Sequence, residues 1–167
     1  MTERGAAPLE PSRIVAQHRI LALDLGRARI GVAITDGLGL TAQPLLTILH
    51  KTTHADLKSI GRILRKHDVA EIVVGHPLHA SGDSSPNSAR AEEFAAALRS
   101  EFSLPVHLWD ERLTTHAAHE LLDETSNARA AQTAANRIAR KKIIDQLAAV
   151  LILESFLAAR SPAGRAV

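Results

Sequence analysis

Residues 20–36 read Ile20-Leu-Ala-Leu-Asp24-Leu-Gly26-Arg27-Ala-Arg29-Ile-Gly31-Val-Ala-Ile-Thr35-Asp36, and this stretch decides how the chain folds. Two aliphatic runs flank a short glycine turn, a pattern that predicts two paired strands. The first run delivers one carboxylate, Asp24, to the end of an apolar strand. Because burying a carboxylate is costly unless something pairs with it or coordinates it, Asp24 is the first candidate functional residue.

Strand and helix patterns alternate on the C-terminal side of this hairpin. Pro44, within the run 42–49, predicts a third strand at the edge of the sheet. Thr53 and Asp56 predict a capping box at the start of a helix over 53–68. The later elements are a strand at 71–75, a helix from Pro86 behind Ser85, a strand at 105–109, a helix from Thr114 to Leu122, and a helix at 136–159. The second half of this last helix is apolar, which predicts that it is buried on most sides. Three antiparallel strands followed by strand–helix–strand crossovers predict an α/β fold with a mixed sheet flanked by helices.

Length and composition bound the class of protein. The 167 residues lack cysteine and contain no apolar run near the ~20 residues that span a bilayer, so we expect a cytoplasmic protein without a membrane partner. We expect one domain over 18–160, with a disordered tail at 1–17, a second tail at 161–167, and a loop or weak helix at 124–135. The net charge of +2 is compatible with an acidic partner, and three phenylalanines and one tryptophan are few for stacking bases. Any nucleic acid would therefore be held through its backbone and shape.

Apolar elements present acids at three places: Asp24, the pair Asp110-Glu111, and Asp145. Clustered carboxylates repel one another unless a hard divalent cation lies between them, and two-metal sites of this kind activate water on phosphodiesters. The structural alternative is that Asp24 caps its turn, Glu111 pairs with Arg112, and Asp145 pairs with Lys141. Spacing alone leaves both interpretations open.

Histidines and basic residues offer further hypotheses. His116 with His119, or His76 with His79, could suggest zinc, but neither pair has a third ligand at recognisable spacing. The loop 75–82 could cradle phosphate through backbone N–H groups before a helix, although a plain connection would look similar. The basic run 137–142 lies beside Asp145 and could contact phosphates, although such runs are usually solvated helix ends.

Four motifs, in order along residues 18–159, resemble the YqgF or RuvX family of Holliday junction resolvase-like proteins. They are Leu23-Asp24-Leu-Gly26-x-x-Arg29-Ile-Gly31-Val-Ala, Ile72-Val-Val-Gly75-His-Pro77-Leu with Gly82, Asp110-Glu111-Arg112-Leu-Thr114-Thr115, and Lys142-Ile-Ile-Asp145-Gln-x-Ala148-Ala149-x-x-Ile-Leu. Each motif is weak alone, and together they are highly specific. The resemblance implies a ribonuclease-H-like, five-stranded mixed sheet.

The resemblance also implies a metal-dependent nuclease that uses Mg²⁺ or Mn²⁺. Its substrate would be structured RNA, at the 5′ end of the 16S ribosomal RNA precursor, or branched DNA such as a four-way junction. By this resemblance Asp24, Glu111 and Asp145 bind metal, with Asp110 as a further candidate because the fourth strand ends in Gly75-His76-Pro77 where related nucleases carry an acid. The residues expected to contact phosphates are Arg27, Arg29, Arg112, Thr114, Arg140, Lys141, Lys142, Gly75 and Pro77.

Two other classes of function remain open from the sequence. Asp-x-Gly followed by a second glycine also begins the ATP site of sugar kinases and actin, but those proteins need a second lobe for which 167 residues leave no room. A non-catalytic module that binds duplex nucleic acid by its shape would also suit a basic, aromatic-poor surface. A four-way junction would call for a dimer, and the sequence fits a monomer or a homodimer.

Overall fold

A computed structural model describes residues 18–78, 85–114 and 134–160 of the chain. Its elements are β1 (Arg19–Leu25), β2 (Arg29–Thr35), β3 (Ala42–Leu49), α1 (Thr53–His67), β4 (Val69–His76), α2 (Pro86–Phe102), β5 (Val106–Asp110), the 3-10 turn η1 (Glu111–Leu113) and α4 (Ala134–Arg160). The five strands form one sheet in the order β3-β2-β1-β4-β5. The pairs β1–β2 and β2–β3 are antiparallel, and β1–β4 and β4–β5 are parallel. The predicted mixed sheet is confirmed, with β3 at its edge.

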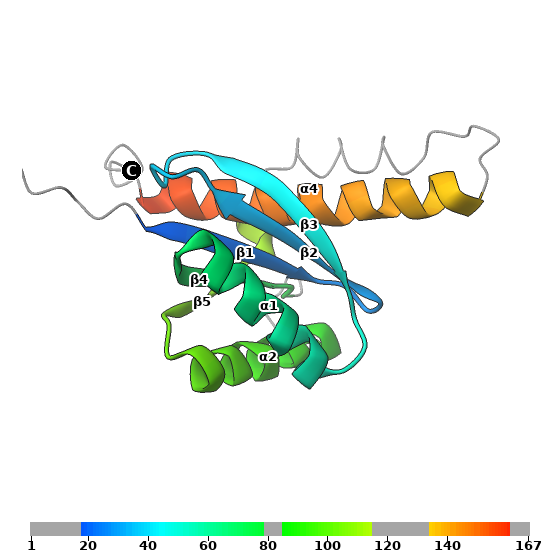
Figure 1. Ribbon diagram of the computed structural model, residues 1–167, viewed down its shortest axis with the longest axis horizontal. Helices are drawn as coiled ribbons and strands as arrows, with labels where there is room; N and C mark the ends of the chain where they lie inside the picture. Colours follow the sequence, from blue (N-terminus) through cyan, green and yellow to red (C-terminus); the bar gives the residue numbers. More distant parts are fainter. Residues whose placement is uncertain (1–17, 79–84, 115–133, 161–167) are drawn as a thin grey trace, which may run out of the picture.

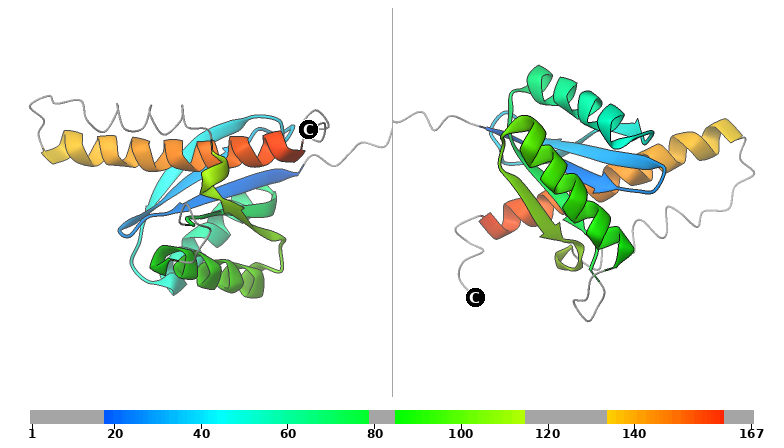
Figure 2. Two further views of the ribbon diagram at one scale, coloured as in Figure 1. Left: turned by 180° about the vertical axis from the view of Figure 1, so that it is seen from behind. Right: turned by 90° about the horizontal axis from the view of Figure 1, so that it is seen from below.

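Helices cover the sheet on both faces: α1 and α2 lie on one face, and α4 crosses the other (Figures 1 and 2). Alternation along the strands divides the core in the same way. On β1, Leu21 and Leu23 pack with the aliphatic residues of α1 and α2, whereas Ile20 and Ala22 pack with α4. Large aliphatic side chains therefore fill the α1 and α2 face, whereas alanines such as Ala22 and Ala33 stand among the larger residues on the α4 face.

The start of α1 corrects the predicted capping box. The N-cap is Thr52, whose hydroxyl accepts a hydrogen bond from the backbone N–H of Ala55 at 3.2 Å. Asp56 is instead buried, 1% exposed, with its carboxylate 2.6 Å from Nδ1 of His50. The predicted start of α2 is confirmed, since Ser85 is its N-cap and Pro86 its first residue.

The expectation that the last helix is buried on most sides is wrong. Ala149, Ile152, Leu153 and Phe156 are buried against the sheet. In the same half of α4, Leu147 is 37% exposed, and Val150, Leu151 and Leu157 are only half-buried. An apolar stretch cannot by itself indicate how many sides of a helix are covered.

Several predictions fall outside the described residues. These are the tails at 1–17 and 161–167, the loop from His79 to residue 84, and the segment 115–133, which holds His116, His119, the helix expected to end at Leu122 and most of the loop expected at 124–135. Within the described ranges, no helix combines the length and apolar character that crossing a bilayer requires.

Candidate active site

Asp24 lies near the carboxyl end of β1 and points to the same face of the sheet as α4. It is paired with Gly31 of β2 in the antiparallel ladder, and residues directly opposite one another share a face. The turn after it is held closed, because Gly26 N donates to the Asp24 carbonyl at 3.2 Å. Arg90 of α2 donates from Nη1 to the Gly26 carbonyl at 2.9 Å. The turn that carries Arg27 is thus anchored to the helical layer on the far face.

Gly31 lets α4 approach the sheet beside Asp24. A Cβ atom at Gly31 would lie 1.9 Å from the carbonyl oxygen of Asp145, a distance that no real side chain could occupy. Nearby, the Thr47 hydroxyl donates to the carbonyl of Lys142 at 3.0 Å, and Gln146 donates to that hydroxyl at 3.3 Å. These contacts position Asp145, which comes 121 residues after Asp24 in the chain, next to the end of β1.

Gly75 leaves room for the Glu111 side chain, as Gly31 does for the backbone of Asp145. The pairing of Leu23 with Val74 places Gly75 beside Asp24 on the other side of β1. A Cβ atom at Gly75 would lie 2.5 Å from Oε1 of Glu111 and 2.7 Å from Cδ1 of Ile152. Glycines on both flanks of Asp24 therefore create the space into which α4 and the Glu111 carboxylate enter.

Glu111 and its neighbour Asp110 are separated by the end of β5, because Asp110 is the last residue of that strand and Glu111 the first of η1. Trp109 lies on the α4 face, where its indole N–H donates to Ser155 at 3.1 Å. Asp110 follows Trp109 and is paired with His76 in the parallel ladder between β4 and β5. Its carboxylate lies 2.6 Å from Nη2 of Arg112. The hydrogen bond from Arg112 lowers the pKa of Asp110. Asp110 is thus engaged by Arg112, and Glu111 is the acid that turns toward Asp24.

The electrostatics of Asp24 and Glu111 indicate negative charges without sufficient compensation. Burial, and then the nearby charge of Asp145, raises the pKa of Asp24 to about 6. Burial, followed by the charges of Asp24 and Asp110, raises the pKa of Glu111 to about 7. Asp24 therefore interacts electrostatically with Asp145 and with Glu111, as the metal hypothesis requires. We call Asp24, Glu111 and Asp145 the carboxylate site.

Asp145 already has a counter-ion, which the sequence did not reveal. Its Oδ2 atom lies 2.7 Å from Nε of Arg29, and the two side chains are 23% and 21% exposed. The alternative pairing with Lys141 is not the one that the structure contains. Arg29 is 116 residues away along the chain, so no local spacing could have indicated this ion pair.

The donors of the carboxylate site fit a hard divalent cation in their chemistry. Mg²⁺ and Mn²⁺ prefer carboxylate oxygens, and a cation would relieve the repulsion that raises both pKa values. Among the described residues no three acidic or histidine side chains already form a metal-ligand group. Asp24 and Glu111 would hold the ion, and Asp145 would join them once its bond to Arg29 opens.

The residues expected to contact phosphates differ in their placement. Arg27, Lys141 and Lys142 are exposed. Arg112 is exposed and binds Asp110, whereas Thr114 is 9% exposed and donates to the Glu111 carbonyl at 2.6 Å. Gly75 is buried beneath Glu111, which gives it a packing role, and Pro77 and Arg140 are half-buried. The phosphate-binding roles of all nine residues stay predictions.

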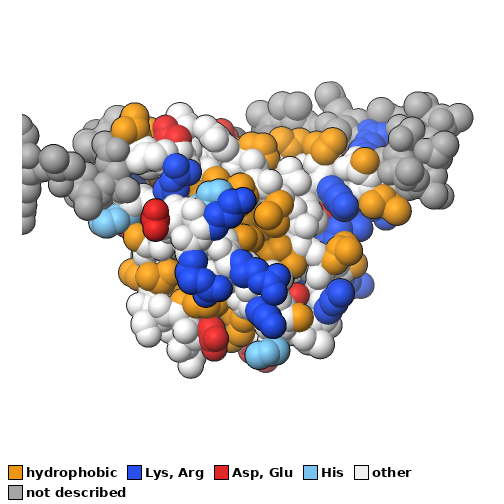
Figure 3. Space-filling model, in the orientation of Figure 1, with side chains coloured by type: hydrophobic (Ala, Val, Ile, Leu, Met, Phe, Trp, Pro, Cys, Tyr) orange, Lys and Arg blue, Asp and Glu red, His pale blue; other side chains and the backbone are white. Residues whose placement is uncertain are grey.

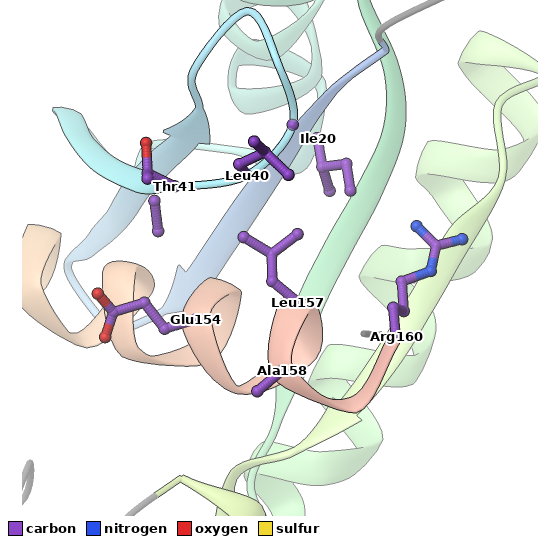
Figure 4. A pocket seen from close by; sticks show the side chains of 9 residues that line it. Ile20, Leu40, Thr41, Glu154, Leu157, Ala158 and Arg160 are labelled. Carbon is purple, nitrogen blue, oxygen red and sulfur yellow. The ribbon is translucent and has the colours of Figure 1, made fainter. Parts of the chain in front are cut away.

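A separate hollow of ≈ 720 Å³ lies at the opposite end of the sheet, beside the last turns of α4 (Figure 4). Ile20, Leu40 and Leu157 line it, with Glu154 and Arg160 among the polar residues around it. Ile20 begins the strand that ends at Asp24, so this apolar hollow is separated from the carboxylate site by the length of β1.

Comparisons with known proteins agree with this geometry. A family model described as "RuvX: Holliday junction resolvase" matches residues 18–159. A protein from Koribacter versatilis named "Putative pre-16S rRNA nuclease" is 44% identical over 151 residues, which cover 90% of this chain and 92% of that protein. A protein of the same name from Geobacillus kaustophilus is 46% identical over 141 residues, covering 83% and 96%.

The similarity to solved structures concerns the fold. The RuvC protein of T. thermophilus, in complex with a Holliday junction substrate, superposes with a TM-score of 0.51 over 86% of this chain and 95% of that chain. The sequences are 15% identical. The ribonuclease-H-like fold expected from the sequence is therefore confirmed.

Proposed function

The chain belongs to the RuvX family of Holliday junction resolvases, and from this premise we propose that it is a metal-dependent endonuclease acting on structured nucleic acid. Its reaction is the hydrolysis of phosphodiester bonds. Its proposed substrate is the precursor of 16S ribosomal RNA, processed at the 5′ end, in keeping with the names of relatives that are 44% and 46% identical to it over the aligned residues.

The observation that carries this proposal is that two glycines let the Glu111 side chain and the backbone of Asp145 come beside Asp24 from distant parts of the chain. A Cβ at Gly31 would strike the backbone of Asp145, and one at Gly75 would strike Glu111. A fold that needed Asp24 only as a turn cap would have no reason to bring two more acids beside it. Raised pKa values for Asp24 and Glu111 are the electrostatic cost of that arrangement.

Each residue then has a distinct task in catalysis. Asp24 and Glu111 would hold Mg²⁺ or Mn²⁺, with Asp145 completing the set. The ion supplies activation of water and stabilisation of the leaving oxygen when it is bound. Arg29, released from Asp145, would be free to contact the phosphate, and Arg27, Lys141 and Lys142 would orient the neighbouring backbone.

A four-way DNA junction is the second candidate substrate. The description of the family model favours it, and the same carboxylates would serve because the scissile bond is again a phosphodiester. Such a junction has two-fold symmetry, so this activity would require a homodimer that cuts twice.

The test is a cleavage assay with two substrates, a 5′ fragment of precursor 16S ribosomal RNA and a synthetic four-way junction, each with Mg²⁺ or Mn²⁺. We expect cleavage of the RNA that EDTA abolishes. Asp24→Asn and Asp145→Asn should each remove the activity while leaving the circular dichroism spectrum unchanged. The matched control is Asp36→Asn, a half-buried acid in the turn beyond β2, which should cleave at the wild-type rate.

Other outcomes assign the function differently. Cleavage of the junction alone would make DNA the substrate. Full activity in both Asn variants would reject the carboxylate mechanism. Tight RNA binding in EDTA without cleavage under either metal would identify a binding module.

A further inference from the structure

A second charged feature lies outside the carboxylate site, between the edge strand β3 and helix α1. It is a hollow of ≈ 520 Å³ whose cationic lining residues are Lys51, Lys58 and Arg62. We call it the basic groove. Figure 3 shows Lys and Arg side chains gathered over the region of α1 in this view.

The positive charge of the basic groove is not used within the described structure. Lys51, Lys58 and Arg62 are exposed, and none of them forms an ion pair with a described acid. Asp56, which also lines the groove, is 1% exposed and is engaged by His50. The cations are therefore available to an anion from solution.

The spacing of these cations follows from the helix. Residues four apart lie on the same side of a helix, so Lys58, Arg62 and the exposed Lys66 form a row along α1. At a rise of about 1.5 Å per residue the row extends roughly 12 Å. None of the described residues that line the groove is aromatic, so a nucleic acid there would be held by its phosphates and not by stacked bases.

The groove opens at the same end of the sheet as the carboxylate site. Leu49 of β3 is paired with Arg29 of β2. The backbone N–H of His50 donates to the carbonyl of Ala28 at 3.0 Å. These bonds place Lys51 beside the turn that carries Arg27, so cations continue from the end of β1 to the surface of α1.

We infer that the basic groove binds the phosphate backbone of a double-helical RNA arm that flanks the cleaved strand. The inference rests on the proposed function for its substrate class. RNA is chosen over DNA because relatives that are 44% and 46% identical carry the name of an RNA nuclease, whereas the likeness to a DNA resolvase structure is one of fold. The sugar and the phosphates of a duplex arm suit a site that recognises shape and charge.

The test compares two RNA probes for wild-type protein and for the double variant Lys58→Gln/Arg62→Gln. One probe is a 5′ tail of about ten nucleotides, and the other is the same tail joined to a hairpin arm of about 15 base pairs. Such an arm is longer than the row of cations on α1, which extends roughly 12 Å. Binding is measured in EDTA over a range of salt concentrations, so that it does not depend on cleavage.

We expect the double variant to bind the arm-bearing RNA roughly tenfold more weakly. The slope of log K against log salt should fall by about 2, since each lost phosphate contact contributes about 0.9. Binding of the tail alone should be unchanged. The matched control is Arg19→Gln/Arg160→Gln, which removes two positive charges at the opposite end of the sheet. It should leave the affinity for both probes unchanged.

Equal affinity and equal salt slope in wild type and double variant would overturn the inference. A DNA hairpin of the same sequence serves as a further probe. If the double variant loses affinity only for this DNA hairpin, the inference is overturned as well. Cleavage of the arm-bearing RNA with Mn²⁺ is measured in parallel. If the wild type cleaves neither RNA, the proposed nuclease function is rejected, and binding in EDTA still tests whether the basic groove binds RNA. If cleavage is normal and the double variant binds as tightly as the wild type, only the proposal for the basic groove is rejected.

Discussion

The two faces of the central sheet are built from the same strands and differ in what fills them. Under α1 and α2 the strands contribute large aliphatic residues such as Leu21, Leu23 and Val32, which are fully buried. Under α4 they contribute alanines and glycines beside Ile20 and Val73, and at one end of this face Glu111 and the backbone of Asp145 come close to the strands. One face stabilises the fold by burying apolar area. The other gives up part of that burial for a site, because close helix packing and space for carboxylates both require small side chains.

The largest effect should separate two adjacent acids. We expect Glu111→Gln to lower the cleavage rate by roughly 10³-fold, equivalent to about 4 kcal/mol of transition-state stabilisation, because Glu111 lies on the α4 face beside Asp24. Asp110→Asn, one residue away but bound to Arg112, should change the rate only a few-fold. Single-turnover cleavage with saturating Mg²⁺ measures both. Equal losses in the two variants would mean that the engagement of Asp110 by Arg112 does not decide which of the two acids acts.

A substitution on the face that packs against α1 and α2 should lower the stability of the protein and leave the cleavage rate unchanged. Leu23→Ala removes a fully buried side chain next to Asp24 in sequence, and we expect the free energy of unfolding to fall by about 2–5 kcal/mol. Urea titration measures this change. The rate per folded molecule, assayed well below the transition, should remain close to that of the wild type. A loss of rate as large as that in Glu111→Gln would show that the two faces are not separable.

Glycine at position 31 links the two faces. In Gly31→Ala the new methyl group would meet the backbone of α4, which cannot rotate away as a side chain can, so we expect a loss of about 1–3 kcal/mol or more. Gly37→Ala is the matched control, since its methyl would lie 3.7 Å from the side chain of Arg19 in ordinary contact. Thermal unfolding of the two variants should show a large and a negligible decrease in Tm. Similar Tm values would mean that α4 can move off the sheet at little cost.

The sequence predicts the positions of the strands and helices far better than it predicts how these elements pack against one another. Aliphatic alternation and the glycine turn are local signals, and they place β1, β2 and the edge strand β3 correctly. The N-cap was assigned to Thr53 and lies at Thr52, because adjacent threonines offer the same chemistry and only the tertiary position of Asp56 distinguishes them. The exposed side of α4 depends on which helices lie above the sheet, and composition does not contain that information.

The candidate site was predicted as a set of residues and not as an arrangement. Asp24, Glu111 and Asp145 came from a family resemblance, and their roles stay predictions. The ion pair between Arg29 and Asp145 and the bond from Arg90 to the Gly26 carbonyl join residues 116 and 64 positions apart. Such contacts follow from packing, for which the chain carries no periodic or local signal.

The pH dependence of stability provides a weaker test of the same contrast. The folded-state pKa values of Asp24 and Glu111, about 6 and about 7, exceed their ordinary values of 3.8 and 4.5. The folded protein therefore binds protons more tightly than the unfolded chain, and stability is lost as the pH rises from about 4 to about 7. For Asp24 the loss is at most about 3 kcal/mol.

Urea titrations in EDTA across this pH range measure the loss, and Asp24→Asn should reduce it. Mg²⁺ should also reduce it, because a bound cation favours the ionised carboxylates. A stability in EDTA that is flat from pH 4 to pH 7 would contradict the crowding of charge at the carboxylate site.

The smallest expected effect concerns Arg29, which compensates Asp145 when no metal is bound. Arg29→Gln removes this competing cation, so Mn²⁺ should bind several-fold more tightly, a change of about 1 kcal/mol. Isothermal titration with Mn²⁺ measures the affinity directly and does not depend on cleavage. Arg27→Gln, an exposed cation two residues away in the same turn, is the control for the general loss of positive charge. If both variants gain affinity equally, the long-range field of the turn is responsible; if only Arg29→Gln gains, the 2.7 Å contact with Asp145 is what the metal must displace.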